Sequence, residues 1–235
     1  MRVRIKFTKT GALKFLGHLD VMRYFQKALR RAEIDVAFSE GFSPHMIMSF
    51  AAPLGLGITS TGEYFDLDLK SADSSASLKK RLNDQMAEGM EVLSVRQIPE
   101  DKASKCMSLV AAADYRVTFR EGTVQLPDNW KDQLKAFENQ ETISILRKTK
   151  RSEGIVDIRP WIYSLGIDGE CITMCLSAGS VHNLKPELVM QAFASFMGIE
   201  LSEYSLLIHR SELYAATGEN PAQLISLEAL GEEIE

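Results

Sequence analysis

The chain begins with a regular alternation of charged and apolar residues. Every second side chain of a strand points to the same side, so the alternation predicts a strand over residues 2–8. One side of this strand carries Val3, Ile5 and Phe7, and the other carries Arg2, Arg4 and Lys6. We expect the apolar side to face a core.

Apolar residues at helical spacing follow between Gly17 and Ala32. At about 100° per residue, Val21, Phe25 and Leu29 share one face of the predicted helix. The opposite face carries four cations, which are Arg23, Lys27, Arg30 and Arg31. The pattern therefore predicts an amphipathic helix with a basic outer surface.

Four more elements are predicted before residue 99. They are strands over 35–38 with 46–50 and over 62–69, a helix over 75–88 and a strand over 91–98. The resulting order of strand, helix, strand, strand, helix, strand is that of a ferredoxin-like unit.

The same order recurs after residue 112. It is marked by strands at 115–119, at Ile143 and Ile145, at 170–176 and at 205–209, and by helices around Trp130 and over 186–197. We therefore predict an α+β fold of two tandem ferredoxin-like domains. The domains span residues 1–99 and 113–214, a polar linker spans 100–112, and an acidic, frayed tail spans 215–235.

Composition places the chain among soluble proteins. Apolar residues make up 45% of its 235 residues, but no run approaches the roughly 20 that a membrane-spanning helix needs. The N-terminus does not resemble a signal peptide, so we expect a cytoplasmic protein. Its three cysteines cannot all pair with one another, which suits a reducing compartment.

The charge is unevenly distributed. The net charge is -5, yet residues 1–60 hold nine Lys and Arg against four Asp and Glu, whereas residues 201–235 hold one Arg against seven Glu. A second basic group consists of Arg147, Lys148, Lys150, Arg151 and Arg159. Two separated basic regions favour a long polyanion such as folded RNA, although solvated surface charge is the simpler explanation.

His18 and His45 are the candidate acid and base. Imidazole titrates near neutrality, so two histidines beside one phosphate could cleave RNA through its 2'-hydroxyl group. His18 falls on the apolar side of the predicted helix, where a structural role is the alternative. His45 follows Pro44 in a polar loop, where we expect it to face a ligand.

Cys171 and Cys175 do not indicate a metal cluster. A radical S-adenosylmethionine (SAM) enzyme needs a third cysteine, and Ala178 occupies its position. The two cysteines would lie on one face of a strand, about 13 Å apart, as packing residues. We expect no cofactor and no metal ion.

Several segments resemble the radical-SAM-linked protein family. They are Phe15-Leu16-Gly17-His18-Leu19-Asp20, Arg30-Arg31-Ala32, Ser39-Glu40-Gly41-Phe42-Ser43-Pro44-His45, Ser49-Phe50-Ala51, Pro53-Leu54 and, less closely, Val156-Asp157-Ile158-Arg159-Pro160. In that family the domain has no known function and occurs alone or fused to the C-terminus of a radical SAM enzyme. Its genes often lie near those of an E/G-type ribonuclease and of ribosomal proteins. The resemblance implies a radical SAM partner and suggests RNA.

The sequence leads to one hypothesis and two alternatives. We expect a non-catalytic accessory protein that binds RNA and presents it to a radical SAM enzyme for modification or processing. The expected RNA-binding residues are Arg23, Lys27, Arg30, Arg31, Glu40, Phe42, Ser43, His45 and Arg159. The alternatives are a metal-independent endoribonuclease that uses His18 or His45, and a protein-interaction module that docks the radical SAM partner.

Overall fold

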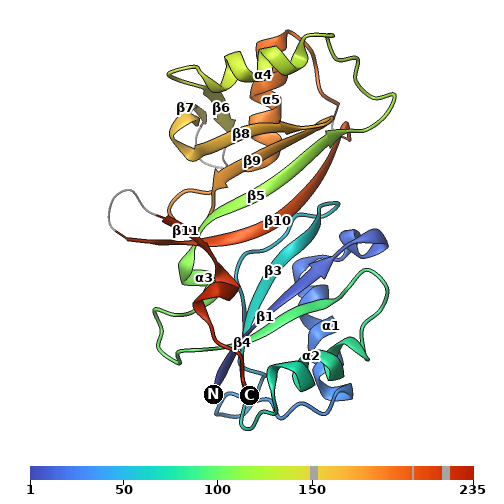
Figure 1. The fold of residues 1–235 in the computed structure, drawn as a ribbon, viewed down its shortest axis with the longest axis vertical. Coiled ribbons are helices and arrows are strands. Elements are labelled where there is room, and N and C mark those ends of the chain that lie inside the picture. Colours follow the sequence, from blue (N-terminus) through green and yellow to red (C-terminus); the bar gives the residue numbers. More distant parts are fainter. Residues whose placement is uncertain (149–152, 203, 219–222) are drawn as a thin grey trace. The chain divides into compact units, whose positions relative to one another are not determined.

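A computed structural model of the chain describes residues 1–148, 153–202, 204–218 and 223–235. The fold is α+β, as predicted, and Figure 1 shows its elements along the chain. The chain divides into two compact units. Unit 1 contains Met1–Ala112 and Arg210–Glu235, and unit 2 contains Ala113–His209.

Unit 1 is built on antiparallel strands of a large sheet. Its elements from the N-terminal part of the chain are β1 (Arg2–Lys9), α1 (His18–Arg31), β2 (Met48–Phe50), β3 (Thr59–Asp68), α2 (Ser75–Asn83), β4 (Val92–Ile98) and the short α3 (Cys106–Leu109). The strand order is β4-β1-β3, and β2 also pairs with β3. β1 runs antiparallel to both of its neighbours.

The apolar residues of β1 face the core of unit 1. Val3, Ile5 and Phe7 form one buried cluster with residues of α1 and α2, so both helices cover the same face of the sheet. Phe7 and Phe25 meet edge to face, with ring centroids 4.7 Å apart. The alternating apolar residues of β1 and the helically spaced apolar residues of α1 therefore pack in a single core.

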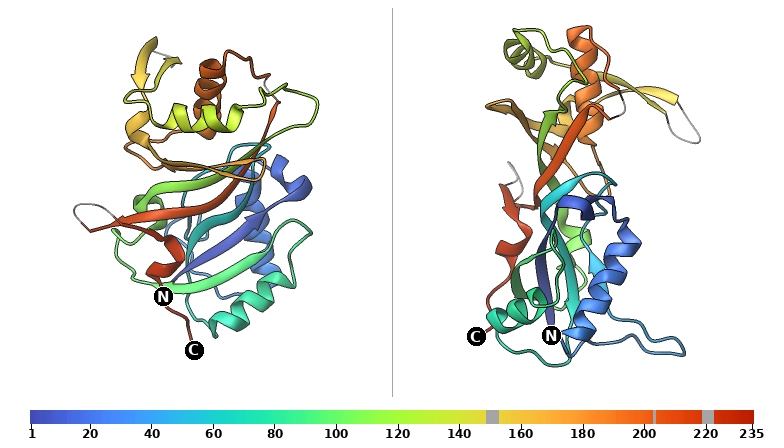
Figure 2. Two further views of the ribbon diagram at one scale, coloured as in Figure 1. Left: turned by 45° about the horizontal axis from the view of Figure 1, so that its top comes forward. Right: turned by 90° about the vertical axis from the view of Figure 1, so that its right-hand side faces the viewer.

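The C-terminal residues belong to unit 1 as well. β10 (Leu206–Thr217) continues past the unit boundary at Arg210, next to β3, and pairs with β11 (Gln223–Ser226). A short 3-10 helix (Leu227–Leu230) follows. In the right-hand view of Figure 2, this segment and α1 lie on opposite sides of the unit 1 strands.

Two expectations about these segments are corrected. Residues 223–235 are not frayed, because the backbone of Gln97 exchanges hydrogen bonds with Glu232 and the Leu227 side chain is fully buried. Residues 100–112 are not a free linker, because Cys106 is buried and α3 packs on unit 1. A polar sequence was expected to stay in solvent, but its polar groups pair with charges of the sheet.

Unit 2 contains strands of the large sheet, a separate hairpin and two helices. Its elements are β5 (Val110–Phe119), α4 (Trp130–Glu138), β6 (Ser144–Lys148), β7 (Glu153–Asp157), β8 (Ile162–Asp168), β9 (Cys171–Ser177) and α5 (Pro186–Met197). The strand order is β10-β5-β9-β8, and β6 pairs with β7 in a separate hairpin. α4 packs on α5 through Phe137 and Phe193, whose ring centroids are 5.4 Å apart.

The strand predicted around Ile143 and Ile145 exists, but it does not join this sheet. It forms β6, and the position next to β9 is taken by β8, which was not predicted. Short apolar runs mark a strand without saying which neighbour it will pair with.

Candidate functional site

The basic surface of unit 1 is the outer face of α1. The helix buries Val21, Phe25, Ala28 and Leu29, so the positions between them face solvent. The side chains of Arg23, Lys27, Arg30 and Arg31 are all exposed. This face is the one that the helical spacing predicts.

The four cations differ in how they are held. Arg23 lies 3.5 Å from the carboxylate of Asp20 in an exposed ion pair, and Arg31 donates a hydrogen bond to the carbonyl oxygen of Gln85. Within the described part of the chain, the side chains of Lys27 and Arg30 make no hydrogen bond or ion pair. These two charges are available to an anionic ligand.

The loop of residues 39–45 is closed by its two ends. The Ser39 hydroxyl group lies 2.8 Å from His45 Nδ1 and accepts a hydrogen bond from the His45 backbone N–H. Gly41 has a φ of 106°, a backbone conformation that residues other than glycine rarely adopt. At the tip of the loop, Glu40, Phe42 and Ser43 are exposed, and Phe42 is fully so.

The two candidate histidines lie in different pockets. His18 meets the ring of Phe50 edge to face at 5.2 Å and shares its pocket with Lys9 and Glu63. His45 lines a second pocket, together with Asp66 and others. The structure therefore places the two imidazoles in separate pockets.

Arg159 belongs to unit 2 and is held by its own loop. Its guanidinium group donates a hydrogen bond to the carbonyl oxygen of Ile162, and its backbone N–H donates to Asp157. Of the other members of the second basic group, Lys150 and Arg151 lie outside the described residues. The structure thus shows Arg159 hydrogen-bonded to residues of its own loop, and its predicted contact with RNA stays a prediction.

The charged face of β1 carries two arginine–aspartate pairs with its neighbour β3. Arg2 and Asp68 are register partners, as are Arg4 and Asp66. Arg4 is 1% exposed, and its guanidinium group forms two hydrogen bonds with the Asp66 carboxylate, at 2.8 and 3.2 Å. The arginines on one side of β1 and the apolar residues on the other are thus both buried.

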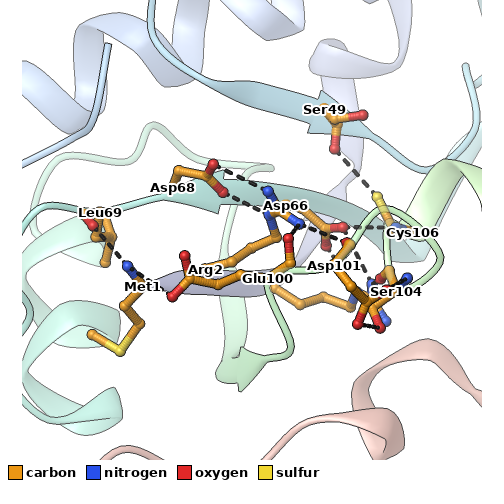
Figure 3. A network of polar contacts seen from close by, with 11 residues as sticks. Met1, Arg2, Ser49, Asp66, Asp68, Leu69, Glu100, Asp101, Ser104 and Cys106 are labelled. Atoms are coloured by element: carbon orange, nitrogen blue, oxygen red, sulfur yellow. Dashed lines mark hydrogen bonds and ion pairs between the residues drawn. The ribbon is translucent and has the colours of Figure 1, made fainter. Parts of the chain in front are cut away.

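Residues of the expected linker complete this network, as Figure 3 shows. The backbone N–H of Cys106 donates to Asp66, and the Cys106 thiol group donates to the carbonyl oxygen of Ser49. The carbonyl oxygen of Ser104 accepts from Arg4. Burial, with the nearby Asp66 charge, raises the pKa of the Cys106 thiol far above its ordinary value, so this cysteine is a structural group.

Lys6, the third cation on the charged face, lies between two carboxylates. Its ammonium group is 2.7 Å from an oxygen of Glu212 and 2.7 Å from an oxygen of Glu228. Tyr64 donates a hydrogen bond of 2.6 Å to Glu212. Burial lowers the pKa of Lys6, but the bonds to the two carboxylates outweigh burial and raise it.

A further charged cluster was not predicted, and it lies on the apolar face of the sheet. It consists of Lys9, Glu63 and Arg210, which are 2%, 4% and 4% exposed. Arg210 holds both oxygens of Glu63, at 2.8 and 2.5 Å. The sequence held one signal, since Lys9 continues the apolar positions 3, 5 and 7 of β1.

The described residues contain no group of three or more His, Cys, Asp or Glu side chains arranged to hold a metal ion. Cys106 and Cys171 are buried, and Cys175 is half-buried. Burial, together with a hydrogen bond to Asp114, raises the pKa of Cys175 to about 12. In the part of the chain that the structure describes, no helix is long and apolar enough to cross a membrane.

Fold and site define an α+β protein of two units, with a basic helix and a buried charged pocket in the first. The chain belongs to a family described as "Uncharacterized protein conserved in bacteria (DUF2344)", whose model matches residues 2–186. No curated protein matches the sequence.

A solved structure titled "Crystal Structure of a Cbf5-Nop10-Gar1 Complex" is similar to this chain, with a TM-score of 0.49 and 9% sequence identity. The match covers 90% of this chain and 48% of that one, so this chain spans about half of its length.

Proposed function

We propose that the protein binds RNA through the outer face of α1 and the loop of residues 39–45. One observation carries the proposal: Lys27 and Arg30 are exposed on the same helical face and have no ionic partner among the described residues. Cations without an ionic partner can neutralise RNA phosphates, and the release of condensed counterions then favours binding. Arg23 extends the same face, because its exposed pair with Asp20 is weak.

Phe42 supplies the second type of contact. Its ring is fully exposed at the tip of a loop whose base is fixed by Ser39 and His45. An unpaired base can stack on such a ring, and stacking contributes about 1–3 kcal/mol per base. Glu40 and Ser43 flank the ring and can accept or donate hydrogen bonds to a base edge.

We propose that the bound RNA is presented to a radical SAM partner. Support comes from the segments that contain His18, Phe42 and His45, which resemble the radical-SAM-linked protein family. The description of the matched family names no such enzyme. In this role the protein positions a substrate and performs no chemistry on the RNA itself.

We also propose that each unit is a ferredoxin-like domain. The strand order of unit 1 is β4-β1-β3 with β2 on β3, and that of unit 2 is β10-β5-β9-β8. Both orders fit a βαββαβ unit whose fourth strand lies beside the first. In unit 2 the β6–β7 hairpin is then an insertion between α4 and β8.

The test is the salt dependence of RNA binding. Replacing Arg23 and Arg30 together with Ala should weaken the binding of a fluorescein-labelled single-stranded RNA. It should also reduce the magnitude of the negative slope of log K against log salt by about 1.4, because each lost phosphate contact on a single strand accounts for about 0.7. Fluorescence anisotropy over a range of KCl concentrations measures both quantities.

A matched control removes two exposed cations elsewhere in unit 1. Lys70 and Lys80 are both exposed, so Lys70→Ala with Lys80→Ala changes the net charge by the same amount. The control should retain the wild-type slope. Equal slopes in all three proteins would contradict the phosphate contacts. Wild-type protein that fails to bind the RNA at low salt would shift the weight to a protein-docking role for the Phe42 loop.

A further inference from the structure

The pocket beneath the first turn of α1 contains a lysine whose surroundings differ from those of an ordinary structural lysine. Lys9 ends β1 just past a register shift between β1 and β3, and it lies on the same face as Phe7. The residue is 2% exposed. A buried ammonium group is costly unless a charge compensates it, so its partners decide what it can do.

The nearest carboxylate is already occupied. Both oxygens of Glu63 accept hydrogen bonds from Arg210, which also donates to the carbonyl oxygen of Ala52. The Lys9 ammonium group donates to the carbonyl oxygen of Leu16 at 2.7 Å and, among the described residues, forms no ion pair. The cluster therefore holds two cations and one carboxylate away from solvent.

The rest of the pocket is mostly hydrocarbon. Besides Lys9, Glu63 and His18, it is lined by Phe7, Val21, Phe50, Ala52 and Leu54. The pKa of Lys9 is lowered, chiefly because burial in such a lining disfavours the charged amine. The nearby Glu63 raises this pKa, and Arg210 lowers it. Removal from water and a second cation nearby are the two conditions that turn a lysine into a nucleophile.

We propose that Lys9 is the nucleophile of a site that takes a small aldehyde or ketone and forms an imine with it. The lone pair of the neutral amine attacks the carbonyl carbon, and the carbonyl oxygen takes up a proton. The carbinolamine then loses its C–O bond and one N–H proton as water, and leaves a C=N bond to Lys9. No oxidant or reductant is needed, since the step exchanges an amine and a carbonyl for an imine and water.

His18 is the group placed to handle the protons. It lines the same pocket as Lys9, and an imidazole ring can both accept and donate a proton. The titratable and charged groups around Lys9 are His18 on α1, Glu63 on β3 and Arg210 on β10. This site is separate from the RNA contacts proposed for Arg23, Lys27 and Arg30, so either function can fail without the other.

The experiment is site-resolved reductive alkylation of the folded protein. The probe is formaldehyde at limiting concentration with a borane reductant, which traps each imine as a methylated lysine that peptide mass spectrometry can quantify. Lys6 is the matched control, since it lies on the same strand with a raised pKa, and Lys27 is the exposed reference. Each unit by which a lysine pKa falls raises its free-amine fraction about tenfold below that pKa.

At pH 7 Lys9 should be methylated faster than Lys27 and faster than Lys6, because its pKa is lowered and that of Lys6 is raised. Lys9→Met should remove that product and leave the labelling of Lys27 unchanged. His18→Asn should slow methylation at Lys9 alone; an unchanged rate would overturn the proton role of His18. Methylation of Lys9 that is absent or slower than that of Lys27 in the wild-type protein would overturn the proposal.

Discussion

Lys6 and Lys9 lie on the same strand, and the chain buries them in opposite ways. Lys6 projects from the charged face between Glu212 and Glu228, whereas Lys9 projects from the apolar face beside a carboxylate that an arginine already holds. The pKa of Lys6 is raised, and that of Lys9 is lowered. The surroundings of each face, rather than burial alone, decide the sign.

The difference separates structural charges from functional ones. On the charged face Arg2 and Arg4 have aspartate register partners and Lys6 has two carboxylates, so each cation there is compensated. On the apolar face, the described cluster has two cations, Lys9 and Arg210, but only one carboxylate, Glu63. An uncompensated buried charge lowers stability, and residues of this kind are concentrated at functional sites. This comparison supports the pocket beneath α1 as the place to look for chemistry.

The largest expected effect tests the compensated face. Arg4→Met removes the partner of the buried Asp66 carboxylate and the donor to Ser104 and Leu227. Breaking one side of a buried ion pair costs about 3–5 kcal/mol, so the urea midpoint should fall sharply. Arg23→Met is the matched control. It removes an exposed pair and should cost about 0–1 kcal/mol. A loss below about 1 kcal/mol at Arg4 would show that this face is not held by its charges.

A second test breaks the cluster on the apolar face. Glu63→Gln keeps the side-chain shape but removes the carboxylate that pairs with Arg210 and lies near Lys9, and we expect a loss of about 3 kcal/mol. In that background Lys9→Met should restore part of the stability, because it removes one of two repelling cations. Coupling between contacting residues is about 0.5–3 kcal/mol, and a double-mutant cycle in urea measures it. Additive losses would mean that Lys9 and Glu63 do not interact.

Local periodicity was enough to predict several elements. β1 at Arg2–Lys9, α1 at His18–Arg31 and α5 at Pro186–Met197 agree with the predicted ranges to within one residue. Each has a clear apolar face that a nearby core requires. The exposure of the α1 cations follows from the same spacing, because residues between core positions must face outward.

Pairing between distant segments could not be predicted in this way. Glu63 and Arg210 are 147 positions apart, and neither local sequence indicates the other. β6 was read as a strand of the main sheet because its apolar residues do not say that β7 is its neighbour. The acidic C-terminal segment was predicted to be a frayed tail from its composition, yet Glu228 pairs with Lys6. The missed part of the site is the part built from long-range ion pairs.

The smallest predicted effect is a difference in how Lys6 and Lys9 contribute to stability as the pH rises. A raised folded-state pKa stabilises the fold below the unfolded value of about 10.4, and this contribution is lost as the pH passes through the folded-state pKa. For Lys9 the folded-state pKa is lowered, so between it and 10.4 the unfolded chain binds more protons and the free energy of unfolding rises with pH.

The two variants Lys6→Met and Lys9→Met should therefore change the pH dependence in opposite directions. Urea unfolding at pH 8 and near pH 11 measures it, and the other titrating groups cancel when each variant is compared with the wild type. Relative to the wild type, Lys6→Met should lose more stability at pH 8 than near pH 11, because the Lys6 ion pairs stabilise only while the amine is charged. Lys9→Met should show the reverse, since it removes an amine that is costly to bury while charged. If the pH dependence of unfolding changed in the same direction in both variants, the surroundings of the two lysines would have the same effect on their pKa. The contrast between structural and functional charge would then be lost.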